Sequence, residues 1–370
     1  MNRSDLVPQH ILSLPVYRPP EIPKHVLSKI GKDGFIHLEN NEISEGPGEA
    51  PIKELIGQCE MLNRYPDPTL SKLRTSLSDS LGLDGDWLHF GAGIEEILTH
   101  ITRAFIDEND EVLISEGTFP LYTNYCRIQR AKQIMVPLKN GHYDLAEFKR
   151  LASSRTRIIF LCNPNNPTGT AFSRKEFESF LVDLPAEPII VLDEAYYEFT
   201  DRNRIPNGID YLSIIPNLIL LRTLSKAYGL ARLRIGYSIQ NPDLGQFLRR
   251  LAPLYSINGF AEAVGAAAIL DQGHLQRTVQ STIERRSHLE RELTLRGYKF
   301  FPSEANFLCI ATPKPARDLA NLLMENGVLV CPLSAFGLSN HIRVTIGKPE
   351  EHHVFLRLLD EVMNHSKPGT

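Results

Sequence analysis

The chain has 370 residues, 42% of them hydrophobic, and a formal net charge of −4 at pH 7. That length predicts a large core and two domains, because single cores rarely grow beyond about 250–300 residues. A negative net charge gives no electrostatic reason to expect nucleic acid or an anionic membrane as partner. Five cysteines without a Cys-x-x-Cys pair argue against a disulfide framework and a zinc ribbon, and we expect no metal site.

From the beginning of the chain we expect no targeting or membrane signal. Met1 to Leu6 lack the apolar core of a signal peptide, and no apolar run approaches the roughly 20 residues that span a bilayer. We therefore expect a location in the cytoplasm. The proline-rich segment from Pro15 to Pro23 predicts an arm without regular structure.

Short apolar runs then alternate with longer amphipathic ones, which is the pattern of parallel strands joined by crossover helices. Strands are predicted at Trp87–Phe90, Glu111–Ser115, Lys132–Val136, Arg157–Leu161, Pro188–Leu192, Leu218–Arg222 and Ile235–Ile239, and helices at Asp144–Ser154 and Ser173–Val182. The pattern changes near Leu244–Ser256. A long helix is predicted at His274–Leu295, followed by a smaller domain with Phe300–Ile310, Leu319–Gly327, Val328–Val330 and a closing helix at Glu350–Asn364.

The predicted fold class is therefore α/β, with a mostly parallel central sheet in a large domain and a smaller α+β domain at the C-terminal end. We expect an N-terminal arm over residues 1–40 that contributes to the small domain. The large domain is expected over 41–245, and the linking helix with the small domain over 246–370.

Polar side chains follow two of the predicted strands. Asn163-Pro-Asn-Asn166-Pro-Thr-Gly169 follows one strand, and Asp193-Glu-Ala-Tyr196 follows another. In an open α/β sheet the ligand crevice lies beyond the carboxyl ends of the strands, so these groups are expected to meet there. Asp193 is suited to hold a proton on a pyridine nitrogen, and Tyr196 and Asn166 to hydrogen-bond a phenolic oxygen. The alternatives are a helix N-cap for Asp193 and a turn residue for Asn166.

A lysine lies among hydroxyls and a second cation in the stretch from Arg222 to Arg234. An amine forms a Schiff base with an aldehyde only when it is deprotonated, and nearby positive charge and burial lower its pKa. Arg234 can supply that charge to Lys226, and it can also bind a phosphate together with Thr223 and Ser225. The alternative is a capped helix with a solvated lysine.

With these segments the chain resembles the fold-type I family of pyridoxal-phosphate enzymes, and most closely the histidinol-phosphate aminotransferase group. Further matching segments are Asn63-Arg-Tyr65-Pro-Asp67-Pro, Gly91-Ala-Gly-Ile-Glu95-Glu, Ser303-Glu-Ala-Asn306-Phe and Ile342-Arg343-Val-Thr-Ile-Gly347. The resemblance implies pyridoxal 5'-phosphate as cofactor, with Lys226 forming the internal aldimine and moving the α-proton. It implies Asp193 on the pyridinium, Tyr196 and Asn166 on the phenolic oxygen, and Thr223, Ser225 and Arg234 on the phosphate.

The resemblance also implies further cofactor contacts. Gly93 would open a helix whose N–H groups at Ile94 and Glu95 face the phosphate. Phe119 would stack on the cofactor ring, and its alternative is a core residue. Tyr65 would reach the phosphate of the neighbouring subunit, which implies a homodimer; its alternative is a half-buried ring in an extended segment.

For the substrate, the resemblance implies that Arg343 binds a carboxylate through its planar fork. Its alternative is a strand arginine that points at solvent. Asn306 and Asn41 are expected to line the same pocket. The chain departs from the histidinol-phosphate enzymes at three positions: Cys331 replaces an arginine that helps to bind the substrate phosphate, Ile43 replaces an asparagine, and Arg232 replaces a glycine.

The resulting prediction is a pyridoxal-phosphate aminotransferase that moves an amino group between an α-amino acid, or a similar amine, and a 2-oxo acid by a ping-pong mechanism, with a role in amino-acid biosynthesis. Loss of the charge at Cys331 predicts that histidinol phosphate is not used. The alternatives are an amino-acid decarboxylase resembling the threonine-phosphate decarboxylases, an amino-acid oxidase on the same scaffold, and a noncatalytic binding domain.

Overall fold

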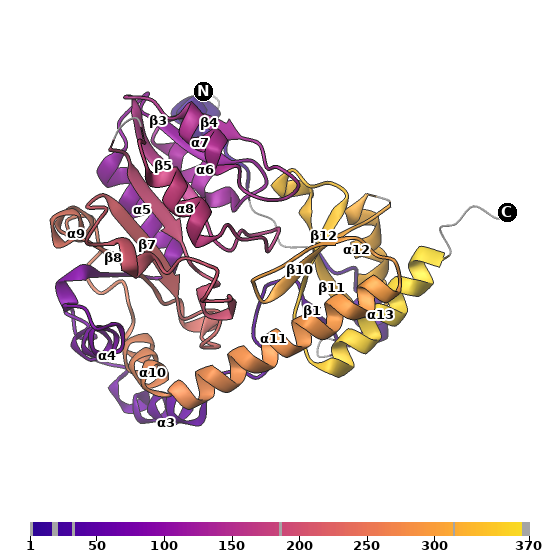
Figure 1. The fold of residues 1–370 in the computed structure, drawn as a ribbon. Helices are drawn as coiled ribbons and strands as arrows, with labels where there is room; N and C mark the ends of the chain where they lie inside the picture. Colours follow the sequence, from indigo (N-terminus) through magenta and orange to yellow (C-terminus); the bar gives the residue numbers. More distant parts are fainter. Residues whose placement is uncertain (1–2, 17–20, 32–33, 185–186, 314, 365–370) are drawn as a thin grey trace.

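The structure, a computed structural model, describes residues 3–16, 21–31, 34–184, 187–313 and 315–364. It contains two hydrophobic cores, each built on its own β-sheet, and a long helix that runs from one to the other (Figure 1). That helix, α11 (Gln272–Leu295), contributes Leu275 to the larger core, and Leu289 and Leu293 to the smaller one.

The larger core is built on a seven-stranded sheet with the order β2-β8-β7-β6-β5-β3-β4. Its strands are β2 (Leu88–Gly91), β3 (Glu111–Ser115), β4 (Lys132–Val136), β5 (Thr156–Cys162), β6 (Ile189–Asp193), β7 (Leu218–Thr223) and β8 (Gly236–Gln240). Strand β8 runs antiparallel to β2 and β7, and the other pairs are parallel. Strands β6 and β7 are buried along their whole length, which explains their continuous apolar sequence.

Helices surround this sheet (Figure 1). They are α5 (Ile94–Phe105), α6 (Pro120–Ile128), α7 (Leu145–Leu151), α8 (Arg174–Leu181) and α9 (Pro242–Arg249). Helix α10 (Gly259–Leu270) packs against α3 (Glu49–Gly57) and α4 (Ser71–Leu81) below the sheet. These three helices form one layer at the end of the large core.

The smaller core lies on a five-stranded sheet with the order β1-β11-β12-β10-β9. Its strands are β1 (Ile36–Leu38), β9 (Phe300–Phe301), β10 (Phe307–Ala311), β11 (Val328–Pro332) and β12 (His341–Thr345). Helices α12 (Ala316–Glu325) and α13 (Pro349–Asn364) pack with α11 on one face of it. Short helices α1 (Gln9–Leu12) and α2 (Lys24–Ile30) precede β1.

The predicted fold class is confirmed, and the predicted strands and helices lie within a few residues of the observed ones. The predicted element at Phe300–Ile310 is two strands, β9 and β10, with a turn between them. The predicted arm from Pro15 to Pro23 lies partly outside the described residues. The domain boundaries stay a prediction. Among the described residues, no helix is long and apolar enough to cross a membrane.

Candidate active site

The candidate site lies at the carboxyl ends of three neighbouring parallel strands. Asn163 follows β5, Asp193 ends β6 and Thr223 ends β7. Because Cys162 pairs with Asp193 and Asp193 pairs with Leu221 in the sheet register, these ends are level with one another. The expected meeting of polar groups at this edge of the sheet is therefore observed.

Asp193 is buried, with 4% of its surface exposed. Its Oδ2 accepts a hydrogen bond from the Tyr122 hydroxyl at 2.5 Å, and its Oδ1 accepts one from the backbone N–H of Ala195 at 3.0 Å. Burial raises the pKa of the carboxyl to about 6, and these two donors oppose the rise. The aspartate is thus an acid of intermediate strength in an apolar setting.

Lys226 lies just after β7 and is half-buried. Its Nζ donates to the backbone carbonyls of Asn40 at 3.0 Å and Asn41 at 3.2 Å. Burial lowers its pKa to about 7, with the charges of Arg343 and then Arg234 acting in the same direction. Arg234 was predicted to supply such a charge, and Arg343, which was not, contributes more. A large neutral fraction is therefore present at neutral pH, as Schiff-base chemistry requires.

Several residues that were expected to face the phosphate lie close together where α5 begins. We call this group, Gly93, the N–H groups of Ile94 and Glu95, Ser225 and Arg234, the phosphate cradle. Gly93 precedes the helix with φ +84°, and a Cβ there would lie 2.5 Å from Arg234 Nη2. A Cβ on Gly236, the partner of Thr223 across β7 and β8, would lie 2.4 Å from the backbone nitrogen of Ile94. Both positions require glycine, because the start of α5, the ends of β7 and β8 and the Arg234 guanidinium lie so close to one another that a side chain would not fit. The first-turn N–H groups, Ile94 and Glu95 included, have no acceptor within the helix.

The hydroxyls of the lysine stretch differ in their contacts. The Arg234 Nη1 lies 3.4 Å from Ser225 Oγ, which places Ser225 in the cradle. Thr223 Oγ1 donates instead to the Ile235 carbonyl at 3.1 Å and accepts from the Ser225 N–H at 3.0 Å. In this structure Thr223 therefore shapes the turn, and its direct phosphate contact stays a prediction.

Two further predicted cofactor residues, Glu95 and Phe119, have side-chain contacts within the protein. The Glu95 carboxylate accepts a hydrogen bond from the Tyr125 hydroxyl at 2.8 Å. The negatively charged side chain is therefore not suited to bind a phosphate, and only the backbone N–H of Glu95 is. Phe119 caps α6 and meets the Tyr122 ring edge to face, with centroids 5.8 Å apart. Phe119 is thereby next to the side chain that holds Asp193.

Arg343 lies in β12 and is only 7% exposed, so the alternative of a strand arginine that points at solvent is wrong. Its Nη1 donates to Asn166 Oδ1 at 2.5 Å and its Nη2 to the Glu39 carbonyl at 2.8 Å. Its Nε is buried without a hydrogen-bond partner among the described residues. A buried guanidinium with a free donor is suited to a bound anion.

A chain of hydrogen bonds joins the two sheets. Asn41, with φ +56°, donates from Nδ2 to the Tyr196 hydroxyl at 3.0 Å. The Asn41 carbonyl accepts from Asn306 Nδ2 at 3.0 Å, and the Asn41 N–H bonds Thr345 Oγ1 at 2.9 Å. The structure therefore brings Asn41, Asn306 and Tyr196 together near Lys226, and the roles predicted for these residues stay predictions.

A row of side chains crosses the face of the small sheet on either side of Arg343. Its cross-strand partners are Cys331 in β11 and Cys309 in β10. Glu39, one residue beyond β1, is next to Cys331, because Leu38 pairs with Val330. Burial raises the pKa of the Cys331 thiol, so the residue is a neutral group. Glu39 Oε2 is buried without a partner among the described residues.

The two other departures lie apart from this row. Ile43 packs against the large core, on the segment that carries Asn41. Arg232 is exposed in a short 3₁₀ helix before Arg234.

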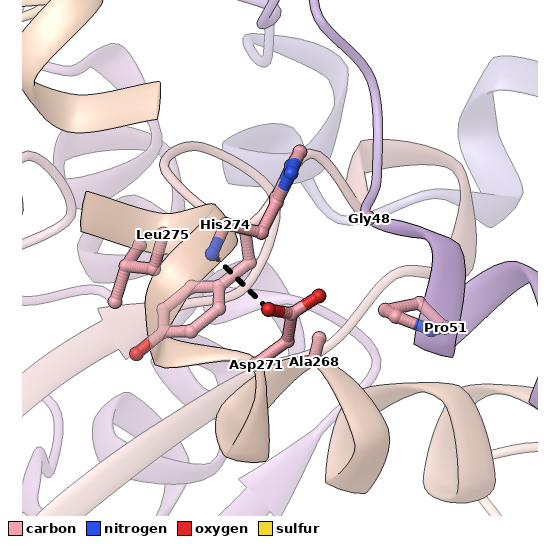
Figure 2. Close-up of a pocket in the computed structure, with 7 residues that line it drawn as sticks. Gly48, Pro51, Ala268, Asp271, His274 and Leu275 are labelled. Carbon is pink, nitrogen blue, oxygen red and sulfur yellow. Dashed lines mark hydrogen bonds between the residues drawn. The ribbon is translucent and has the colours of Figure 1, made fainter. Parts of the chain in front are cut away.

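The segment from Asn41 to Gly48 is fastened to the first turn of α11. Figure 2 shows Gly48 and Pro51 facing Asp271 and His274, where a Cβ on Gly48 would lie 2.5 Å from Asp271 Oδ2. The seam between them leaves no room for a water molecule. His274 Nε2 also lies 3.1 Å from the Gly46 carbonyl. This close packing holds the far end of the segment whose first residue, Asn41, accepts a hydrogen bond from Lys226.

Tyr65 is not part of this constellation. It is 82% exposed and stacks on Tyr255 with centroids 4.7 Å apart. Its predicted role in a neighbouring subunit stays a prediction.

These residues fit pyridoxal phosphate. The cradle at Gly93 and Arg234 is open only because a Cβ is missing there, and Asp193 is suited to a pyridine nitrogen. The buried Asn306 Oδ1 and Arg343 Nε have no partner among the described residues, which leaves polar groups for a bound molecule. No group of three metal-binding side chains occurs in the described part of the chain.

Comparisons with known proteins agree with this geometry. The family model for aminotransferase class I and II matches residues 34–359. Histidinol-phosphate aminotransferase 1 of Nitrosococcus oceani is 35% identical, over 95% of each chain. Histidinol-phosphate aminotransferase 2 of Pasteurella multocida is 32% identical, over 98% of this chain and 100% of the relative. The structure of histidinol-phosphate aminotransferase from Sinorhizobium meliloti with pyridoxal-5'-phosphate has a TM-score of 0.87 and 26% identity, covering 99% of each chain.

Fold and site together define a fold-type I pyridoxal-phosphate enzyme. The chain belongs to the class I and II aminotransferase family. The predictions of a pyridoxal-phosphate-dependent aminotransferase and of its cofactor are thereby confirmed.

Two parts of the site were not predicted from the sequence. Tyr122 was not among the predicted site residues, although its position three residues after Phe119 places both rings on one face of a helix. The carbonyls of Glu39 and Asn40 carry no side-chain signal at all.

Proposed function

We propose that this aminotransferase moves an amino group from an α-amino acid, or a similar amine, to a 2-oxo acid. The observation that carries the proposal is Lys226, an amine with a pKa of about 7 in the same site as the buried Arg343. A base that is poised near neutral pH next to an anion-binding guanidinium is what removal of a proton beside a carboxylate requires.

In the proposed mechanism each side chain has a separate task. Pyridoxal phosphate, when bound, supplies an electron sink. Arg343 binds the anionic group of the substrate and so fixes which bond of the α-carbon is aligned for cleavage. Lys226 Nζ would accept the proton from the substrate's α-carbon and would be the group that passes it on to the cofactor. Asp193 keeps a proton on the ring nitrogen through its carboxylate.

A second candidate concerns the donor. The curated relatives are named histidinol-phosphate aminotransferases, which favours histidinol phosphate as the amine. Against it stands the row beside Arg343, where a neutral thiol at Cys331 and the carboxylate of Glu39 offer no second cation to a phosphate dianion. Hydrogen bonds to charged groups contribute about 1.5–3 kcal/mol each, so we propose that histidinol phosphate is a poor donor.

One experiment tests both points. The cofactor-loaded protein is mixed anaerobically, without a 2-oxo acid, with single amino acids or with histidinol phosphate, and the cofactor absorbance is followed. Conversion to the amine form of the cofactor by an amino acid is the expected result. Conversion by histidinol phosphate alone would contradict the substrate proposal. Binding without conversion, with release of carbon dioxide or uptake of oxygen, would favour the decarboxylase or oxidase instead.

We also propose a homodimer. Large apolar side chains are exposed on and beside α3, next to Tyr65; they are Ile52, Leu55, Ile56, Met61 and Leu62. A cluster of this kind on one surface supports burial against a second copy. A location in the cytoplasm likewise stays a proposal.

A further inference from the structure

Tyr122 is fixed at the back of the proposed cofactor site. It is 1% exposed in α6, its ring stacks on Phe160 with centroids 5.1 Å apart, and Phe119 meets its edge. With the ring held on two sides, the hydroxyl has one direction, toward Asp193 Oδ2 at 2.5 Å. The residue thus contacts Asp193 and not the open part of the site.

The bond has a fixed polarity. Burial raises the pKa of Tyr122 well above its ordinary value, so the phenol keeps its proton and acts as donor. Of the two donors that oppose the effect of burial on Asp193, Tyr122 contributes more than the Ala195 N–H. Together they leave one lone pair on each carboxylate oxygen for another partner.

Resting on the cofactor site assigned above, we propose that Tyr122 is a positioning residue that keeps Asp193 ionised and aimed at the ring nitrogen of the cofactor. A Tyr122→Phe substitution keeps the packed ring and removes only the donor. The carboxyl then takes up a proton more readily, because burial is opposed by one hydrogen bond in place of two. A protonated carboxyl is a weaker partner for a pyridinium.

The test compares two ligands of the apoprotein, pyridoxal phosphate and its deaza analogue, in which a carbon replaces the ring nitrogen. Dissociation constants are measured by fluorescence titration at pH 7.5. For Tyr122→Phe we expect the affinity for pyridoxal phosphate to fall about tenfold, as for loss of one hydrogen bond to a charged group. The affinity for the deaza analogue is expected to change less than about twofold, since it has no nitrogen for Asp193.

Tyr143→Phe is the matched control. Tyr143 is also a buried tyrosine, with its hydroxyl 2.9 Å from Thr118 Oγ1 and 3.3 Å from the Cys162 nitrogen. It has no hydrogen bond to Asp193 among those observed. We expect the ratio of the two affinities to stay at the wild-type value in this variant.

The ratio of the affinities for pyridoxal phosphate and the deaza analogue also distinguishes failure of the proposed Tyr122 role from failure of the cofactor site. An equal loss for both ligands, or no loss for either, would overturn the role of Tyr122. Partial unfolding of the variant lowers both apparent affinities alike, so the ratio still decides. Wild-type protein that binds neither ligand would instead refute the cofactor site itself.

Discussion

Arg343 shows how a single residue can look ordinary in the sequence and act differently in the fold. Its alternation in β12 matched a strand with one solvated face. In the structure Arg343 is instead buried, with Asn166 and the Glu39 carbonyl as partners. A buried charge is kept only where partners offset its desolvation, and the unpartnered Nε marks the place for one more.

Replacing Arg343 by alanine is therefore expected to weaken substrate binding selectively. The KM for the amino donor should rise about 10- to 100-fold, since a charge-assisted hydrogen bond is lost. The dissociation constant of pyridoxal phosphate should stay within about twofold of wild type, because the cradle lies at Arg234. Steady-state kinetics and cofactor titration measure the two quantities.

Arg357→Ala serves as control, since Arg357 is an exposed partner of Glu361 on α13. It should leave both quantities unchanged. If the KM of Arg343→Ala also stayed at the wild-type value, the anion-binding role of Arg343 would be refuted.

At the scale of elements, strands were predictable because buried parallel strands are continuous apolar runs between polar turns. Glu111–Ser115 and Lys132–Val136 coincide with β3 and β4. The polar residues after the strands followed from the same pattern. What sequence could not give is contact between elements: the bond from Tyr122 to Asp193 joins residues 71 positions apart, and backbone carbonyls such as that of Asn40 leave no trace in side-chain chemistry.

One contact between elements has a consequence for stability. His89 in β2 and His100 in α5 are buried, with Nε2 and Nδ1 3.0 Å apart. Burial lowers the pKa of His89 to about 3, with His100, Arg249 and Arg74 acting the same way. Burial also lowers the pKa of His100, where Glu96 opposes and Arg103 assists.

We expect the free energy of unfolding to fall as the pH drops below about 6.5. The unfolded state takes up protons on these histidines near that pH, whereas the folded state holds them neutral, so acid favours unfolding. Each histidine can contribute up to about 1.4 kcal/mol per pH unit below that point. Urea unfolding at pH 7.5 and pH 5.5 measures the change.

His89→Gln should be less sensitive to pH over this interval than wild type, whatever its stability at pH 7.5. The pH dependence of His352→Gln can be compared with that of His89→Gln, because His352 is also buried with a pKa lowered to about 4. An unchanged pH dependence in His89→Gln would contradict the proposed role of the pair.

At the scale of the whole molecule, the site is assembled between two sheets. Lys226, Asp193 and Arg234 come from the large core, whereas Arg343 and Asn306 belong to the small sheet and its turn. The segment around Asn41 bonds to both. If Tyr65 acts in the neighbouring subunit, the complete site needs a third contribution, from a second chain.

That requirement can be tested by complementation. Lys226→Ala and Tyr65→Ala subunits, each poorly active alone, are expressed together in equal amounts. In a twofold-symmetric dimer about half of the molecules are mixed, and each has one intact site, so about a quarter of wild-type activity per subunit should return. Activity no higher than the sum of the separate variants, in protein shown to be mixed by mass, would exclude a shared site.

Three consecutive carbonyls, of Glu39, Asn40 and Asn41, accept hydrogen bonds from two cations of the site: Arg343 bonds the first, and Lys226 the other two. Arg343 also lowers the pKa of Lys226, so an anion that neutralises the guanidinium raises it. Linkage is reciprocal: the apoprotein must bind that anion more tightly when the lysine is protonated, and affinity must weaken as the pH rises through about 7. Docking of the substrate's acid group and the proton affinity of the lysine are a single coupled equilibrium.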